Sequence, residues 1–197
     1  MLKIQLVDRN EGMCEAWQKE FNNCKDVEIH CADIFSIKTD CIVSPANSFG
    51  FMNGGIDLYV ENKYEIQKAL QNKIKTLEFG ELLVGQTIMV QTKDPLMSFV
   101  LVAPTMRVPM IIKDTVNVYL ASKAIFQRLG TQIDVRSVTI PGLGAGVGQV
   151  PYQYVAKQMK QAYEEIWNNK PKFPASWDEA QKNHQLLYSR IYRDLQY

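Results

Sequence analysis

Two glycine-rich stretches follow short apolar runs, and their residue types suit the binding of an anion. The first spans residues 43–57 and contains Asn47, Gly54, Gly55 and Asp57. Glycine and other turn-forming residues let a loop bend with its backbone N–H groups exposed. Where such a loop leads into a helix, those N–H groups and the helix dipole favour an anion such as phosphate.

Residues 138–151 repeat this arrangement, with GLGAGVG at residues 142–148 between an apolar run and a helical pattern. Two strand–loop–helix units in one small chain predict that two loops bind one phosphorylated ligand. Neither loop matches the GxxxxGK[ST] phosphate loop, and no acidic residue about 20 positions later obviously suits the ribose of a dinucleotide. The simpler alternative is that both stretches are tight turns of an α/β fold.

The composition is that of an ordinary globular domain. The chain has 197 residues, enough for one domain with a substantial core. Hydrophobic residues make up 46% and the formal net charge is +1, so no overall basic field indicates bulk nucleic acid. No apolar run is long enough to span a membrane, and the first residues lack the features of a signal peptide. We therefore expect a cytoplasmic protein.

Four cysteines and two histidines offer little catalytic or metal-binding chemistry. Cys14, Cys24, Cys31 and Cys41 lack CxxC spacing, which argues against a zinc site and favours buried free thiols. With so few histidines, a Ser–His or Cys–His nucleophilic mechanism would be hard to build. We therefore expect neither a metal nor a cofactor.

Alternating strand and helix patterns predict the elements that position the two loops. Apolar runs predict strands at residues 2–7, 27–31, 41–44, 85–91, 99–103 and 136–140. Helical spacing of apolar residues predicts helices at residues 11–21, 58–77, 116–129 and 152–167. A turn at residues 93–95 makes the two strands around it a candidate antiparallel pair. The predicted fold class is α/β, a sheet with helices on both faces.

In order and spacing, residues 33–34, 42–48, 54–57 and 141–151 resemble the signature of the macrodomain family. The match extends over residues 27–167. The resemblance implies a three-layer α/β/α fold with a mixed sheet, and a module that binds ADP-ribose. It divides the chain into a macrodomain at residues 1–170 and a helical tail at residues 171–197, which packs on the domain or extends from it.

The resemblance also implies a role for each matched residue. Asp33 and the backbone of Ile34 would bind adenine, and Asn47 would contact the distal ribose. Asp57 stands where hydrolytic members of one branch carry an aspartate that activates water or orients this ribose, so Asn47 and Asp57 are the implied catalytic residues. The remaining implied contacts to the diphosphate and ribose are Ala46, Gly54, Gly55, Ile56, Leu143, Gly144, Ala145, Gly146, Val147 and Tyr152. Repulsion from bound phosphates would raise the pKa of Asp57, as a general base requires.

Several residues depart from the family pattern. Ser44 and Pro45 stand in place of the first two residues of the frequent Asn-Ala-Ala-Asn, and Asn53 replaces the first of three glycines. The histidine and glycine that often follow the hydrolytic aspartate are absent. No strand pattern after residue 167 carries the aromatic side chain that stacks on adenine in many members. Phe173, Trp177 or another aromatic residue would supply it, although Trp177 is also explained as an anchor of the tail.

Two functions follow from the resemblance. The first is hydrolysis, which would remove ADP-ribose from a modified protein or nucleic acid, or a phosphate or acyl group from an ADP-ribose metabolite. The second is a non-catalytic reader of free or attached ADP-ribose, which the changes after Asp57 favour. Recognition of another nucleotide or of nucleic acid is a third alternative. The sequence leaves the acceptor and the oligomeric state open, with a monomer the simplest expectation.

Overall fold

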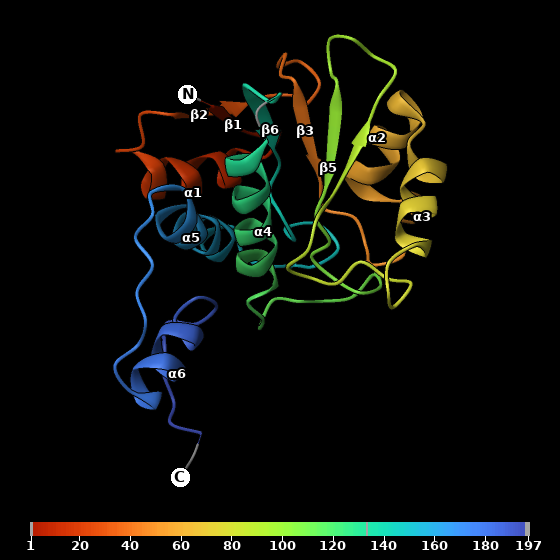
Figure 1. Cartoon of the computed structure of the whole chain (residues 1–197). Helices are drawn as coiled ribbons and strands as arrows, with labels where there is room; N and C mark the ends of the chain where they lie inside the picture. Colours follow the sequence, from red (N-terminus) through yellow and green to blue (C-terminus); the bar gives the residue numbers. More distant parts are fainter. Residues whose placement is uncertain (1, 133, 196–197) are drawn as a thin grey trace.

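The computed structural model describes residues 2–132 and 134–195, and its central element is a mixed six-stranded sheet in the order β2-β1-β6-β3-β5-β4 (Figure 1). Neighbouring strands run parallel, except for β4 and β5, which pair antiparallel as predicted. The strands are β1 (Lys3–Asp8), β2 (Val27–Cys31), β3 (Cys41–Ser44), β4 (Ile88–Gln91), β5 (Phe99–Val102) and β6 (Ser137–Ile140).

Helices cover both faces of the sheet, so the predicted three-layer α/β/α fold is confirmed (Figure 1). One buried cluster joins one face to α1 (Glu11–Phe21), α4 (Asn117–Thr131) and α5 (Tyr152–Ala162). A second cluster joins the other face to α2 (Gly55–Tyr64) and α3 (Gln67–Lys75).

Strand β3 shows why the sequence forms these layers. All four of its residues are buried, and Ile42 and Val43 pack into opposite clusters. Successive side chains of a strand point to opposite faces, so a strand covered on both sides is expected to be mostly apolar, as Cys41, Ile42 and Val43 are. The short apolar run in the sequence is therefore a central strand, and the polar stretch that follows it starts at the edge of the sheet.

The single helix predicted over residues 58–77 is wrong, because α2 and α3 are separate helices. Glu65 ends α2 in the left-handed conformation, with φ of 50°, and its N–H donates to Glu61 O at 2.8 Å. Gln67 begins α3 and forms hydrogen bonds with α2 and with the first loop. Its N–H donates to Glu61 Oε2 at 2.7 Å, and its Oε1 accepts from the Met52 N–H at 2.6 Å. The break therefore depends on contacts with the first loop, and the apolar spacing alone could not reveal it.

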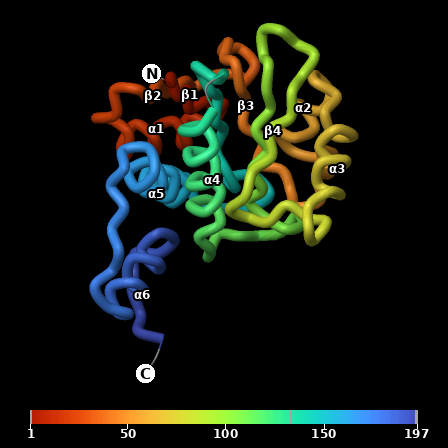
Figure 2. The backbone as a smooth tube through the Cα atoms, viewed as in Figure 1, coloured from red at the N-terminus to blue at the C-terminus, as the bar shows by residue number. Residues whose placement is uncertain are grey.

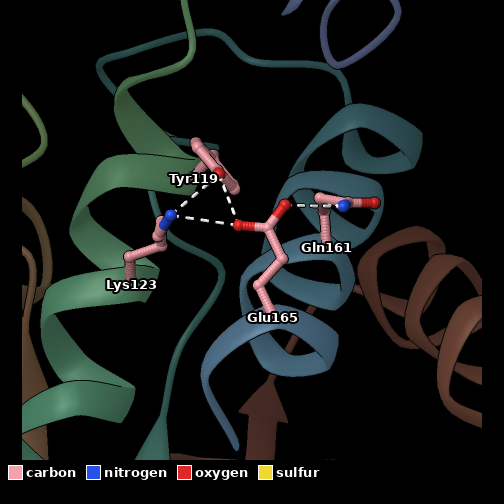
Figure 3. Close-up of polar contacts among 4 residues, drawn as sticks. All are labelled: Tyr119, Lys123, Gln161 and Glu165. Carbon is pink, nitrogen blue, oxygen red and sulfur yellow. Dashed lines mark hydrogen bonds and ion pairs between the residues drawn. The ribbon is translucent and has the colours of Figure 1, made fainter. Parts of the chain in front are cut away.

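A polar network holds α4 against the helical segment that continues α5, a π-helical turn at Tyr163–Trp167 (Figure 3). Glu165 Oε2 accepts from Tyr119 Oη at 2.6 Å and from Lys123 Nζ at 3.0 Å. Gln161 Nε2 donates to Glu165 Oε1 at 2.7 Å. Burial opposes ionisation of Glu165, but these hydrogen bonds outweigh it and lower the pKa of the carboxyl. The network thus fixes α5, the helix that follows the second glycine loop.

The C-terminal segment lies beside one end of α5 and carries α6 (Trp177–Gln185), drawn in blue in Figure 2. Leu187 is buried, and Gln158 Nε2 on α5 donates to its carbonyl at 3.2 Å. Trp177 is 62% exposed, so the suggestion that it anchors the tail is wrong and Leu187 has that role. The predicted tail ends at residues 196 and 197, outside the described residues, and the domain division at residue 170 stays a prediction.

The four cysteines are free thiols, but they are not all buried as predicted. Cys14 and Cys41 are buried, Cys24 is half-buried, and Cys31 is exposed because it ends the edge strand β2. Within residues 2–132 and 134–195, no group of three or more His, Cys, Asp or Glu side chains is placed to hold a metal ion. In the same ranges, no helix has the length and apolarity needed to cross a membrane.

The left-handed residue between α2 and α3 leads to a stability prediction. Replacing Glu65 with glycine removes the steric cost of a positive φ, so the free energy of unfolding should rise by roughly 0.5–1 kcal/mol. The matched control is Ala69→Gly on the exposed side of α3, which should lower it by roughly the same amount because the helix interior disfavours glycine. Urea denaturation measures both changes, and a destabilised Glu65→Gly variant would contradict the assignment.

Candidate functional site

The two predicted loops meet in a cleft of about 410 Å³, next to the carboxyl ends of β1, β6 and β3. Open α/β sheets bind ligands at this edge, where the chain leaves neighbouring strands in opposite directions. Most of the predicted site residues line this cleft: Ala46, Asn47, Gly54, Gly55, Ile56, Asp57, Gly144, Ala145, Gly146, Val147 and Tyr152. Leu143 does not, because its side chain is fully buried in the core.

A second cavity of about 340 Å³ adjoins the first and contains the predicted adenine-binding residues Asp33 and Ile34. Asp8, Gly55 and Ile56 line both cavities, so the two form one elongated site. The structure therefore brings together five segments that lie apart in the sequence, at residues 8–10, 32–35, 45–59, 105–109 and 141–152. Asp8 was not predicted, although its place at the end of the first strand is the signal that could have identified it.

The first loop presents unpaired backbone N–H groups at the start of α2. Gly54 is the N-cap residue, and Gly55 has φ of 56°, a conformation that favours glycine. Within the described chain, the N–H groups of Gly55, Ile56 and Asp57 have no hydrogen-bond acceptor, and no side chain caps this helix end. This geometry suits an anion that accepts hydrogen bonds from several backbone N–H groups at once.

The second loop is folded tightly, and residues 144–148 line the cleft. Gly144 has φ of 70°, its carbonyl accepts from the Val150 N–H at 3.1 Å, and a Cβ on Gly148 would lie 2.5 Å from that carbonyl oxygen. Ile112 N–H donates to Gly148 O at 2.9 Å and braces the loop from outside. In the part of the chain that is described, the N–H groups between Gly144 and Gly148 find no acceptor.

Asn47 lies in the cleft, but most of its hydrogen-bonding capacity is used by its own loop. Its Nδ2 donates to Phe51 O at 2.7 Å, and its Oδ1 accepts from the N–H groups of Phe49 and Phe51, both at 3.2 Å. An asparagine side chain has two N–H donors and one oxygen with two lone pairs. Asn47 therefore holds residues 47–51 in shape and retains one N–H to donate to a ligand.

Asp57 is half-buried at the first turn of α2. Its Oδ1 accepts from Ser44 Oγ at 2.5 Å and from the Ala46 N–H at 3.2 Å. Burial raises the pKa of the carboxyl to about 6, although both hydrogen bonds oppose that shift. Desolvation by the protein therefore raises this pKa by itself, and the further effect of bound phosphates stays a prediction. A carboxyl that titrates near neutral pH suits general acid–base chemistry.

Asp33 has the opposite environment at the far end of the site. Its Oδ1 accepts from the Phe35 N–H at 2.7 Å, and its Oδ2 forms an ion pair with the Arg9 guanidinium. The Phe35 N–H and then Arg9 lower the pKa of Asp33, so this carboxylate stays ionised and accepts hydrogen bonds. Arg9 was missed in the sequence, although it directly follows the first strand.

The aromatic residues lie differently from the sequence-based suggestions. Phe173 and Trp177 line neither cavity, and Phe173 is 93% exposed. Tyr152, at the start of α5, lines the first cleft. The second cavity is lined instead by Phe35 and by Tyr59 on α2, neither of which was predicted. Tyr59 stands one helical turn after Ile56, which is the spacing that would have indicated it.

Comparison with known proteins identifies the family. The family model described as Macro domain matches residues 43–159, and the chain belongs to this family. A protein of uncharacterised function from Aquifex aeolicus is 30% identical to this chain over 149 residues, which cover 75% of this chain and 84% of that protein.

Solved macrodomain structures share the fold. The macrodomain of Mycobacterium tuberculosis DarG matches with a TM-score of 0.59 and 22% identity, covering 68% of this chain and 88% of that chain. The Oceanobacillus iheyensis macrodomain with ADP matches with a TM-score of 0.58 and 19% identity, covering 71% and 75%. Thermosipho africanus DarTG in complex with ADP-ribose matches with a TM-score of 0.58 and 15% identity, covering 82% and 50%.

The raised pKa of Asp57 predicts how stability depends on pH. An unfolded aspartate has a pKa near 3.9, so the folded protein binds the proton of Asp57 more tightly than the unfolded chain does. The contribution of this proton to folding stability is present at low pH and is lost as the pH rises through about 6. At pH 7.5, Asp57→Asn should therefore be more stable than the wild type by on the order of 2 kcal/mol. The gain should vanish near pH 4, where both side chains are neutral.

Urea denaturation across this pH range measures the effect. Asp134→Asn, which removes an exposed carboxyl outside both cavities, is the control and should show no such gain. An Asp57→Asn variant that gains nothing at pH 7.5 would show that burial does not disfavour the ionised carboxylate.

Proposed function

We propose that this protein binds ADP-ribose along the two cavities and hydrolyses an ADP-ribose derivative. One observation carries the proposal: the residues with unpaired amides in both loops line one cleft, and Asp57, with its near-neutral pKa, lines it beside them. The Oceanobacillus and Thermosipho macrodomains, solved with ADP and with ADP-ribose, support a ligand of this class.

The polar groups define the direction of the ligand. Asp33 is an ionised acceptor and suits the amino group of adenine in the second cavity. The diphosphate would accept hydrogen bonds from the backbone N–H groups of the two loops, whose glycines let phosphate oxygens approach the backbone closely. The distal ribose would then lie near Asn47 and Tyr152, with the remaining N–H of Asn47 donating to a ribose hydroxyl.

The same arrangement supports hydrolysis at the distal ribose. Asp57 Oδ1 is held by Ser44 and Ala46, and within the described residues its Oδ2 has no hydrogen-bond donor. Oδ2 would take a proton from a water whose oxygen bonds to the anomeric carbon of the distal ribose, or to the phosphorus or acyl carbon of an ester. The bond from that atom to the leaving group breaks, and the leaving group takes up a proton from solvent. The two loops hold the substrate in register, an orientation effect that lowers the barrier.

The substrate would be an ADP-ribosylated protein or nucleic acid, ADP-ribose 1″-phosphate or an O-acyl-ADP-ribose. A non-catalytic reader of ADP-ribose is the second candidate function. The hydrogen bonds of Asn47 favour this reader function. Its side chain uses most of its hydrogen-bonding groups within its own loop, so only one N–H is left to orient a ribose. The reader needs the two amide loops but makes no use of the pKa of Asp57.

Gly146 tests binding without disturbing the fold. A Cβ at this position meets no atom within 4 Å and the residue lines the cleft, so Gly146→Val should fold normally and place a side chain among the phosphate-binding amides. Calorimetric titration should show that ADP-ribose binds this variant at least about tenfold more weakly, a loss of 1.4 kcal/mol. Gly130→Ala on α4 also faces open space and should bind as the wild type does. Wild-type affinity in Gly146→Val would overturn the proposed ligand position.

The pH dependence of turnover separates the hydrolase from the reader. The substrates to test are ADP-ribosylated protein, ADP-ribosylated DNA and ADP-ribose 1″-phosphate. With Asp57 as the base, turnover should rise through pH about 6 as the carboxyl ionises and then level off. Asp57→Asn should still bind ADP-ribose but lose about 10²–10⁴-fold in rate. Asp134→Asn is again the control, and binding without turnover on all three substrates would establish the reader.

A further inference from the structure

The second cavity has polar groups that could recognise the edge of a base, but no tail residue up to 195 lines it to cover the face of that base. Asp33 and Arg9 form the polar end of the cavity, while Phe173 and Trp177 lie outside it. Two aromatic side chains do line it, Phe35 and Tyr59. Because a flat base gains binding energy from a flat apolar partner, one of these two is the candidate stacking residue.

Phe35 is already engaged by its neighbours. Its ring packs edge-on against Tyr64, with ring centroids 6.1 Å apart and an interplanar angle of 64°. Lys63 Nζ lies 4.5 Å from the centroid of the Phe35 ring, over its face. A base could use this face only by displacing the ammonium group, so Phe35 serves as a wall of the cavity rather than as a free platform.

Tyr59 is free of such contacts. Its side chain is 59% exposed, and across residues 2–132 and 134–195 it makes no hydrogen bond, ion pair or ring contact. It stands three positions after Ile56 on α2, and residues three apart share one face of a helix. Ile56 lines both cavities, so this face of α2 continues from the diphosphate loop to the base cavity.

We propose that Tyr59 is the stacking residue for the adenine base of ADP-ribose. The ring covers the face of the base, while the carboxylate of Asp33, held by Arg9 and the Phe35 N–H, accepts from the amino group at its edge. The N-terminal part of α2 then serves two parts of one ligand: the amides of Gly55 and Ile56 would bind the diphosphate, and Tyr59 would cover the base. This inference rests on the proposed function, because it assumes that adenine occupies the second cavity.

Four substitutions at one position separate stacking from other kinds of contact. Calorimetric titration with ADP-ribose should show Tyr59→Ala binding at least about fivefold more weakly than the wild type. Tyr59→Phe and Tyr59→Trp should keep wild-type affinity, because each retains a flat ring. Tyr59→Leu should bind as weakly as the alanine variant, since an aliphatic side chain cannot stack. Tyr59 is exposed, so these variants should keep the wild-type unfolding free energy, which urea denaturation checks.

The control is Phe79→Ala, which removes another exposed aromatic side chain, one that lines neither cavity. It should bind ADP-ribose as the wild type does. Fluorescence gives a second measurement, since ADP-ribose should quench the added emission of Tyr59→Trp relative to the wild type.

The outcomes also separate this inference from the proposed function. If Gly146→Val abolishes binding but Tyr59→Ala binds normally, adenine is held without Tyr59 and only the stacking assignment falls. Full affinity in Tyr59→Leu would likewise overturn stacking, because the contact would then be merely apolar. A wild-type protein that fails to bind ADP-ribose would overturn both proposals.

Discussion

The lateral pairing of β6 with β1 on one side and β3 on the other is the constraint on which the site depends. Each glycine-rich loop begins where one of these buried strands ends. Parallel strands place their carboxyl ends at the same edge of a sheet, so this pairing sets two loops side by side that lie nearly 100 residues apart in sequence. A sheet in another order would separate the loops, and neither could then complete an anion site alone.

The loops must stay ordered while several of their amides remain unpaired. Hydrogen bonds and close backbone packing in and around the loops meet this requirement. Asn47 hydrogen-bonds within the first loop, and Ile112 binds the second loop from outside. Gly144 and Gly148 approach each other too closely for any side chain. These contacts leave the amides of residues 55–57 and 144–148 unpaired, so the loop shape is set before a ligand arrives, which lowers the entropy lost on binding.

Two carboxylates at opposite ends of the site have opposite properties because their surroundings differ. Asp33 lies near the surface beside a guanidinium and a backbone N–H, which favour its ionised form. Asp57 is desolvated at the start of α2, and burial favours its protonated form despite two hydrogen bonds. Under the proposed function this difference would separate their roles, with Asp33 as a fixed acceptor and Asp57 as the group that exchanges protons. Ser44, which departs from the family pattern, is one of the donors that orient Asp57.

The sequence by itself determined the strands, most of the helices, the two glycine loops and many of the residues that line the cleft, because each depends on local periodicity, turn chemistry or the spacing of a short motif. Only the tertiary structure decided the break between α2 and α3, which depends on Gln67 bonding to the first loop. It also decided how much of Asn47 is left for a ligand, why the pKa of Asp57 is raised, and which aromatic side chain reaches the second cavity. Those properties arise from burial and from contacts between residues remote in the chain, and no local pattern records either of them.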